Sequence, residues 1–370
     1  MVEDDKAGSP KPTISDVARL AGVSKGLVSF AFNNRPGVAP QTRERILAAA
    51  DELGWRPSLN AKSLSTRTSF ALGLVIRREP RIIAADPFFP AFMAGVESVL
   101  IEEGRVLVLS VVPNRTAEDR TYRTLVAENR VDGVFLTDLR HDDDRIRLLQ
   151  GLKVPTATIG HPEASGPFPV VNLDDSTGIA QAVRHLVGLG HRQIAHVAGD
   201  PLMLHSTRRA DSFRRTMAEA GLDGSVVLDT DFSPAGGAAA THALLESEPA
   251  LTAIVYANDP MAVAGLGVLH ARGLGVPEDL SIVGFDGIDM GRYVFPALTT
   301  IEADAESWGA AAARTLLTLI AHGQAPDVEL PPAQLVTRAS TGPPRSVSHP
   351  PTSTGHSFQP LHPFPHARTP

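Results

Sequence analysis

The chain reads TISDVARLAGVS over residues 13–24 and KGLVSFAF over residues 25–32. In the first stretch the apolar residues recur at the spacing of one buried helical face, which comprises Ile14, Val17, Ala18 and Ala21. Gly22 then ends the helix, and Ser24 is a good N-cap for a second helix over Lys25–Phe32. The two stretches therefore predict two short helices joined by a tight, glycine-containing turn.

A third helix is expected after a loop. Residues 33–37 (NNRPG) have the composition of a turn, and the next helical pattern begins near Pro40 and stops at Gly54. Its inward-facing residues are expected to be Ile46, Leu47, Ala50 and Leu53. Two helices joined by such a turn, with a third helix to bury them, are typical of the helix-turn-helix motif.

From Phe70 onward, short apolar strands alternate with amphipathic helices, which predicts parallel sheets with right-handed crossovers. The expected strands are Phe70–Ile76, Arg105–Val111, Gly133–Thr137, Thr156–Ile159, Val170–Leu173, Gln193–Ala198, Val226–Leu228, Ala253–Tyr256 and Ser281–Phe285. This number of strands suits two sheets better than one, so we expect two lobes. We place the crossings between the lobes near residues 161–169, near residues 296–300 and at about residue 326.

The composition limits the class of protein. With 370 residues, 43% hydrophobic and 20% charged, the sequence is typical of a soluble protein of two or three domains. It has no cysteine, which excludes disulfides, thiolate zinc sites and cysteine nucleophiles. We find neither an apolar signal segment nor a run long enough to span a membrane, so we expect a cytoplasmic protein without a membrane partner.

The net charge of −7 is unevenly distributed. Between Lys11 and Arg67, nine Lys and Arg residues stand against four Asp and Glu, a balance of +5 that leaves −12 for the remainder. A basic segment on an acidic body is expected when only one part of a protein meets phosphate. We divide the chain into a disordered lead (1–11), a helix-turn-helix DNA-binding domain (12–56), a linker (57–66), an α/β domain (67–344) and a disordered tail (345–370).

Motifs along most of the chain point to one family. Beyond TISDVARLAGVS, they are Val28-Ser29, Asn33, Thr42–Ile46 (TRERI), Leu53–Pro57 (LGWRP), Pro87–Phe89 (PFF), Arg130–Gly133 (RVDG), Leu189–Ala195 (LGHRQIA), Asn258-Asp259, Val276–Asp286 (VPEDLSIVGFD) and Leu298–Ile301 (LTTI). In this order they closely resemble the lactose-repressor (LacI/GalR) family of transcriptional regulators. The resemblance implies a small all-α helix-turn-helix head and an α/β periplasmic-binding-protein-like sensor domain of two parallel-sheet lobes.

In a helix-turn-helix, the N-terminal residues of the second helix reach base edges in the major groove. The candidates for DNA contact are Ser24, Lys25, Gly26, Leu27, Ser29, Phe30 and Asn33. Lys25 can donate to guanine, whereas Ser24 and Ser29 can bond phosphate. The family usually has a threonine where Leu27 stands and an arginine where Phe30 stands. The resemblance therefore implies an operator half-site unlike the common one, with Phe30 making only apolar contact or packing inward.

Residues 57–65 (PSLNAKSLS) resemble the hinge helix of the family, which in a dimer inserts a leucine into the minor groove. The matching residue is Leu64. A segment this short is not helical alone in water, so its order would depend on DNA and on the sensor domain. The alternative is a plain linker.

The resemblance also assigns residues to an effector site between the lobes, at the carboxyl ends of the strands. They are Phe88, Phe89, Arg209, Phe232, Asn258 and Asp286. The alternatives are a surface arginine for Arg209, a core ring for Phe232, a turn aspartate for Asp286, and for Asp259 the N-cap of the helix at Met261. Together the polar groups favour a sugar, and a nucleoside-like ligand would also fit.

We therefore expect a homodimeric repressor that reads a pseudo-palindromic operator in double-stranded DNA and associates with the nucleoid. The tail lacks leucine heptads, which favours a dimer over a tetramer. The alternatives are an α/β enzyme or a sugar-binding module without specific DNA binding. The sequence places no nucleophile–base pair and no complete cofactor motif, so we expect no catalytic residue and no cofactor. His141–Asp144 is read as a solvated loop rather than a metal site, and the sequence gives no reason for the long stretch Arg77–Asp86.

Overall fold

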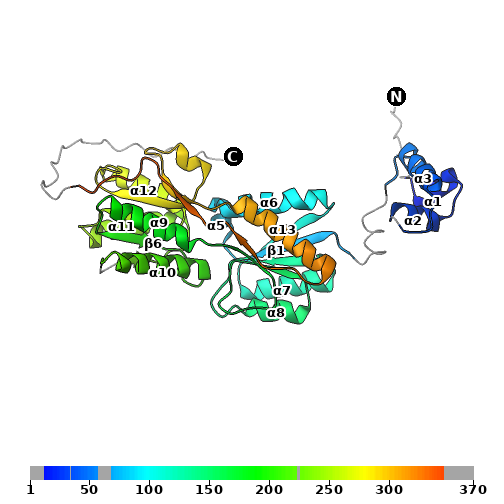
Figure 1. The fold of residues 1–370 in the computed structure, drawn as a ribbon, viewed down its shortest axis with the longest axis horizontal. Helices are drawn as coiled ribbons and strands as arrows, with labels where there is room; N and C mark the ends of the chain where they lie inside the picture. Colours follow the sequence, from blue (N-terminus) through cyan, green and yellow to red (C-terminus); the bar gives the residue numbers. More distant parts are fainter. Residues whose placement is uncertain (1–11, 34, 57–67, 223–225, 346–370) are drawn as a thin grey trace, which may run out of the picture. The chain divides into compact units, whose positions relative to one another are not determined.

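Figure 1 shows the computed structural model, which describes residues 12–33, 35–56, 68–222 and 226–345. The expected lead, the hinge with Leu64, and all of the expected tail except Arg345 lie outside these residues. Within them, no helix combines the length and the apolar character needed to cross a membrane.

The head consists of three helices, as the sequence predicts: α1 (Ile14–Ala21), α2 (Lys25–Phe32) and α3 (Pro40–Glu52). Gly22 ends α1 in the left-handed conformation, with φ of 64°. The buried core of the head comprises Val17, Ala18, Ala21, Val28, Ala31, Ile46, Ala49 and Ala50. Leu47, expected to face inward, is 39% exposed, and Ala49 takes the inward position instead.

Beyond the head, the chain folds into two α/β units, and it passes between them three times. Unit 1 runs to Leu173 and also includes Asp304–Pro331, whereas unit 2 comprises Asp174–Ala303 and the chain from Pro332 onward. The crossings thus lie a few residues further along than the three stretches to which the sequence pointed. Helices cover both faces of each sheet (Figure 1).

Unit 1 contains an entirely parallel sheet in the order β11-β5-β4-β3-β1-β2. Its strands are β1 (Ala71–Ile76), β2 (Val106–Val111), β3 (Gly133–Leu136), β4 (Thr156–Ile159), β5 (Val170–Leu173) and β11 (Val328–Leu330). Its helices are α5 (Pro80–Ala85), α6 (Phe88–Glu102), α7 (Arg115–Ala127), α8 (Asp144–Leu152) and α13 (Ala305–His322). Because β2 lies at the edge of the sheet, one side of its backbone has no neighbouring strand among the described residues.

Unit 2 repeats this plan with the order β12-β10-β9-β8-β6-β7, in which only β12 is antiparallel to its neighbour. Its strands are β6 (Ile194–Val197), β7 (Val226–Leu228), β8 (Ala253–Tyr256), β9 (Ser281–Asp286), β10 (Thr299–Glu302) and β12 (Gln334–Val336). Its helices are α9 (Ser176–Gly188), α10 (Leu204–Glu219), α11 (Pro234–Ser247), α12 (Asp259–Ala271) and the short 3-10 helix η1 (Asp289–Arg292). The structure therefore adds β10, β11 and β12 to the nine strands expected from the sequence.

Two glycines allow α6 and α13 to pack closely on unit 1. A Cβ atom on Gly95 would lie 1.9 Å from the carbonyl oxygen of Glu306, and one on Gly309 would lie 2.0 Å from that of Phe92. Any larger side chain at either position would force the helices apart. This pairing fixes the segment after unit 2 onto the beginning of unit 1.

Candidate functional site

The recognition helix α2 presents one exposed face and one buried face. Ser24 caps its first turn, since the Ser24 Oγ accepts a hydrogen bond from the backbone N–H of Leu27 at 3.2 Å. Lys25 and Gly26 follow directly and are exposed, and Phe30, one turn further on, is 40% exposed. The exposed face thus carries the residues that the sequence assigns to base contact.

The other candidates for DNA contact have partners within the head. Leu27 is partly buried against the head core. The Asn33 amide donates to the Ser29 hydroxyl at 3.3 Å, so these two side chains brace the last turn of α2. The Ser29 hydroxyl can still donate to a phosphate, because the contact with Asn33 uses only its oxygen as acceptor. Leu64 lies outside the described residues.

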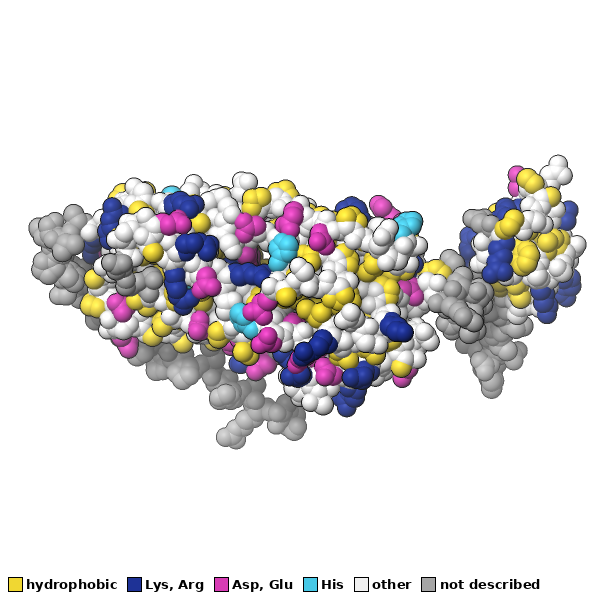
Figure 2. All heavy atoms as spheres, turned by 60° about the horizontal axis from the view of Figure 1, so that its bottom comes forward, with side chains coloured by type: hydrophobic (Ala, Val, Ile, Leu, Met, Phe, Trp, Pro, Cys, Tyr) yellow, Lys and Arg dark blue, Asp and Glu magenta, His cyan; other side chains and the backbone are white. Residues whose placement is uncertain are grey.

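Arginines of α3 bond the C-terminal ends of both α1 and α2. Arg45 donates from Nε to the carbonyl oxygen of Ala21 at 3.0 Å, and Arg43 donates to that of Ala31. Sequence reasoning missed these roles, because only folding brings α3 to the ends of α1 and α2. Figure 2 shows that Lys and Arg outnumber Asp and Glu on the visible face of the head. The head therefore offers a positively charged surface around a rigid, exposed helix.

In unit 2, polar side chains gather where β8 and β9 end. Arg209 on α10 donates from Nε to Asp175 Oδ2 at 2.7 Å and from Nη1 to the carbonyl oxygen of Ala257 at 2.9 Å. Its Cζ atom lies 3.6 Å from the centroid of the buried Phe285 ring. The side chain is 11% exposed, so Arg209 is not the surface arginine that the sequence left open. Asp175, which sequence reasoning did not assign to the site, positions it.

Asp286, Asn258 and Asp259 lie at the same strand ends but serve different purposes. Asp286 ends β9, is partly exposed and has φ of 105°, a conformation that is strained for a non-glycine residue. Asn258, rather than Asp259, caps α12: its oxygen accepts from the N–H of Met261 and its amide donates to the carbonyl of Phe232, both at 2.9 Å. Its principal bonds are thus internal to unit 2.

Asp259 is fully buried behind these residues. Its carboxylate accepts from the Thr300 hydroxyl at 2.6 Å and from the N–H of Ile288 at 2.8 Å, which ties α12 to β10 and to the loop after β9. Burial raises the pKa of Asp259 to about 6, although both hydrogen bonds act in the opposite direction. Asp259 therefore holds the loop that follows Asp286, and Asn258 takes the N-cap position that the sequence left open as an alternative for Asp259.

Two of the aromatic residues assigned to the effector lie in hydrophobic cores. Phe89 is fully buried in unit 1 and Phe232 is 5% exposed in unit 2. For Phe232 the core alternative is thus the one that the structure favours. A Cβ on Gly199 would lie 1.9 Å from the Phe232 ring, so the ring lies directly beneath the end of β6. Phe88 is partly exposed and stacks on Phe92, with ring centroids 5.5 Å apart.

The structure supplies a reason for the long stretch Arg77–Asp86 in unit 1. Most of this stretch forms the helix α5. Arg78 joins its two ends by donating to the Asp86 carboxylate at 2.9 Å, and it also donates two bonds to the Asp138 carboxylate at 2.7 and 2.8 Å. All three side chains are less than a tenth exposed. Asp86 also accepts from the N–H of Phe88 at 3.0 Å, so the bridge fixes the start of α6.

On the other side of the same sheet, Glu118 of α7 is fully buried among Arg77, Arg140 and Arg145, with N···O distances of 3.1 to 3.2 Å. Tyr122 lies beside them, and burial raises its pKa to about 12. Arginine and glutamate at this density form a rigid internal network. The network stabilises the strand ends of unit 1 and presents no predicted effector residue.

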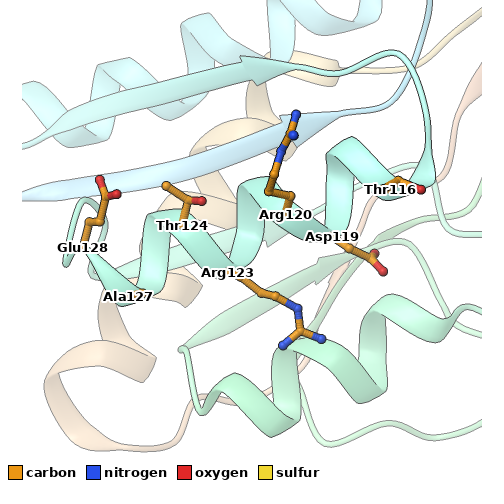
Figure 3. A pocket seen from close by; sticks show the side chains of 7 residues that line it. All are labelled: Thr116, Asp119, Arg120, Arg123, Thr124, Ala127 and Glu128. Atoms are coloured by element: carbon orange, nitrogen blue, oxygen red, sulfur yellow. The ribbon is translucent and has the colours of Figure 1, made fainter.

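A surface depression of about 430 Å³ lies along the outward face of α7. It is lined by Thr116, Asp119, Arg120, Arg123, Thr124, Ala127 and Glu128. Figure 3 shows that Arg120 and Arg123 leave the helix in different directions. All lining residues come from one helix, so the depression is a shallow surface feature and does not coincide with the predicted effector site.

The segment His141–Asp144 takes part in ion pairs and helix capping. His141 Nδ1 lies 2.7 Å from Glu163 Oε1. Asp143 caps α8 and pairs with Arg145. Asp144 pairs with one arginine on α7 and one on α8. Among the described residues, no group of three or more potential ligands is placed to hold a metal ion. These side chains therefore have structural partners of their own.

Comparison with known proteins identifies the family. Residues 13–58 match the family model described as bacterial regulatory proteins, lacI family, and residues 183–341 match the model of a periplasmic-binding-protein-like domain. The HTH-type transcriptional regulator CelR of Thermobifida fusca is 34% identical over 316 residues, covering 84% of this chain and 92% of CelR. The chain belongs to the LacI family.

Solved structures of this family share the fold described above. The complex of the regulator CelR with cellobiose superimposes with a TM-score of 0.69 at 32% identity. The match covers 89% of this chain and 99% of the CelR chain. The Lac repressor dimer bound to operator and the anti-inducer ONPF superimposes with a TM-score of 0.78 at 28% identity. The match covers 90% of this chain and 100% of the Lac repressor chain. This LacI-family chain is thus a DNA-binding transcriptional regulator controlled by an effector, and the names of its relatives do not support an enzyme.

Proposed function

We propose that the chain is a repressor that binds a two-fold operator as a homodimer and changes its operator affinity when a sugar binds to unit 2. The observation that carries this proposal is the exposed face of α2, where Lys25, Gly26 and Phe30 project from a helix whose other side is buried. A rigid, exposed helix within a basic head is suited to enter a major groove. In this proposal Ser24, Ser29 and Asn33 position the helix, Leu27 packs at its rim, and Leu64 forms the minor-groove wedge.

The homodimer is supported by apolar side chains that the described residues leave uncovered. On unit 1 they are Ile101 on α6 and Val106, Leu109 and Val111 on the edge strand β2. On unit 2 they are Met290, Tyr293 and Phe295, of which Phe295 is 98% exposed. An edge strand with an apolar face invites association unless another surface covers it. A second copy, related by two-fold symmetry, would cover it and would present two heads to one operator.

The effector proposed is a sugar, with a nucleoside-like ligand as the alternative. Support comes from Arg209 and Asp286, an arginine and a carboxylate that together offer donors and acceptors to hydroxyl groups. Asp175 holds Arg209 in place. The relative CelR has been solved with cellobiose, which makes saccharides the first compounds to try. Asn258 and Phe232 would shape the site from within rather than touch the ligand.

The DNA-binding proposal is tested by gel-shift titration of the purified chain on fragments of its own promoter region, at two salt concentrations and with random competitor duplex. One fragment should bind specifically, and its affinity should fall steeply with salt because bound counterions are released. A sugar-binding module without regulation would show no preference for any fragment. Thermal-shift screening of saccharides, cellobiose included, and of nucleosides then tests the effector, and the active compound should alter the gel shift.

A further inference from the structure

The loop after the recognition helix carries an arginine that lies over an exposed ring of that helix. The Cζ atom of Arg35 is 5.6 Å from the centroid of the Phe30 ring. Phe30 belongs to the exposed face of α2, and Arg35 is itself exposed. A guanidinium group on the face of an aromatic ring is attracted by the electrons of the ring. At an exposed position this attraction raises the population of side-chain conformers that contact the ring by roughly two- to fivefold.

The backbone of Arg35 is held on both sides of the residue. Its N–H donates to the carbonyl oxygen of Phe30 at 3.0 Å, and its own carbonyl oxygen accepts from Nη2 of Arg43 at 3.4 Å. Arg43 in turn is anchored on the carbonyl of Ala31 at the end of α2. The Cα of Arg35 is therefore fixed relative to α2, and only the side chain needs to be ordered when DNA binds.

Phe30 cannot read a base by hydrogen bonding, because its ring offers no donor or acceptor. It can make apolar contact with a thymine methyl group, whereas an arginine can bind guanine O6 and N7 with two parallel hydrogen bonds. The separation between ring and guanidinium exceeds the roughly 3.4 Å rise between base pairs. With this separation along the DNA axis, the two side chains would contact neighbouring base pairs of one half-site.

We propose that Arg35 is a specificity-determining residue, held by the ring of Phe30 so that its guanidinium reads a guanine in the major groove beside the base pair that Phe30 covers. This proposal rests on the proposed function, because it requires α2 to enter the groove. It assigns base readout to the loop after α2 as well as to the helix itself. A phosphate contact is the competing role for an exposed arginine next to DNA.

The test is selection of binding sites from random duplexes by the full chain, followed by affinity measurement on the selected site and on sites with single base changes. The variants are Arg35→Ala, Arg35→Lys and Phe30→Ala. Arg19→Ala is the matched control, because Arg19 is an exposed arginine on α1 that pairs with Asp16. Thermal melting of each variant establishes that the head remains folded.

The wild type should select a guanine at one position of each half-site and discriminate against other bases there by roughly 5- to 150-fold. Arg35→Ala should lose the preference at this position and keep it elsewhere. Arg35→Lys should lose most of it as well, because an ammonium group keeps the charge but lacks the planar pair of donors. Phe30→Ala should weaken it partly, and Arg19→Ala should leave it unchanged.

A phosphate contact by Arg35 would give a different result. If Arg35→Ala weakens binding to all sequences alike and lowers the salt dependence, while Arg35→Lys behaves as wild type, Arg35 is a phosphate contact and the proposal is wrong. If the wild type selects no sequence at all, the proposed function itself fails. The two failures are thus distinguished by the wild-type selection alone.

Discussion

The guanidinium of Arg209 lies directly on the ring of Phe285, with 3.6 Å between Cζ and the ring centroid. The ring belongs to β9 and is fully buried, so it forms a fixed floor beneath the charge. Asp175 and the end of β8 hold two of the guanidinium nitrogens. Unit 2 therefore holds this arginine in one orientation, and in the proposed effector site such preorganisation would lower the entropic cost of binding.

Arg209→Ala should lower effector affinity by roughly 10- to 150-fold, because each charge-assisted hydrogen bond contributes about 1.5–3 kcal/mol. Operator affinity without effector should stay near that of the wild type, because the head does not involve this residue. Calorimetric titration with the effector identified by screening, and gel shift without it, measure the two quantities.

The matched control for this variant is Arg214→Ala. Arg214 lies on the same helix, α10, but is half exposed and pairs with Asp211 on the surface. It should bind effector as the wild type does. Equal affinities for the Arg209 variant and the wild type would remove Arg209 from the effector site.

Arg78→Ala should strongly destabilise unit 1. The change leaves Asp86 and Asp138 buried without their shared cation, and breaking a buried ion pair in this way costs about 3–5 kcal/mol. Urea unfolding followed by circular dichroism measures the loss. Arg81→Ala is the control, since Arg81 is exposed and pairs with the exposed Glu79, and it should change stability by no more than about 0.5 kcal/mol. Similar stabilities for the two variants would show that the bridge does not hold the segment.

These contacts indicate how far the sequence leads and where it stops. The helices of the head were predicted well because Gly22, Ser24 and Pro40 are local signals that act within a few residues. The strands β10 (TTIE), β11 (VEL) and β12 (QLV) were missed because each lacks the run of three or more apolar residues that marks equally short strands such as β7 (VVL) and β8 (AIVY). Short strands of this kind leave no period in the sequence.

The site residues divide in the same way. The family resemblance assigned Arg209 and Asp286 to the proposed effector site but not Asp175, because only tertiary folding brings Asp175 to an arginine 34 residues away. Likewise, nothing local distinguishes a ring such as Phe89 that ends in the core from one that meets ligand. That Asn258 rather than Asp259 caps α12 follows from the turn geometry at the start of this helix, which the residue types alone leave open.

Lysine at both Val106 and Leu109 should convert the protein to a monomer. Both side chains are exposed on the edge strand β2, where two added charges would have to be buried in a dimer interface. Sedimentation should show the mass of a single chain, and affinity for a two-fold operator should fall by roughly 100-fold or more, because the second head loses its high effective concentration. Threonine at the same positions is the control and should leave the dimer intact. A variant with both lysines that still sediments as a dimer would rule out β2 as part of the interface.

His196 should make unit 2 sensitive to acid. The side chain is fully buried, stacked on Phe213 with centroids 5.3 Å apart, and burial lowers its pKa from 6.5 to about 4. Between these two values the unfolded chain binds a proton that the folded chain does not, so stability falls as the pH falls. From pH 7 to pH 5 this residue should remove about 2 kcal/mol of stability.

His196→Leu tests this expectation through the difference between the two pH values rather than through stability at either one. Asp259 acts in the opposite direction, because a carboxyl whose pKa is raised to about 6 stabilises the fold as the pH falls towards 4. Its contribution is present in both proteins and cancels when the variant is compared with the wild type at each pH. Urea unfolding at pH 7 and pH 5 should therefore show a smaller loss in His196→Leu than in the wild type. Replacement of the exposed His322 by glutamine should leave the loss as large as in the wild type, and an equal loss in the His196 variant would mean that this histidine titrates normally in the folded protein.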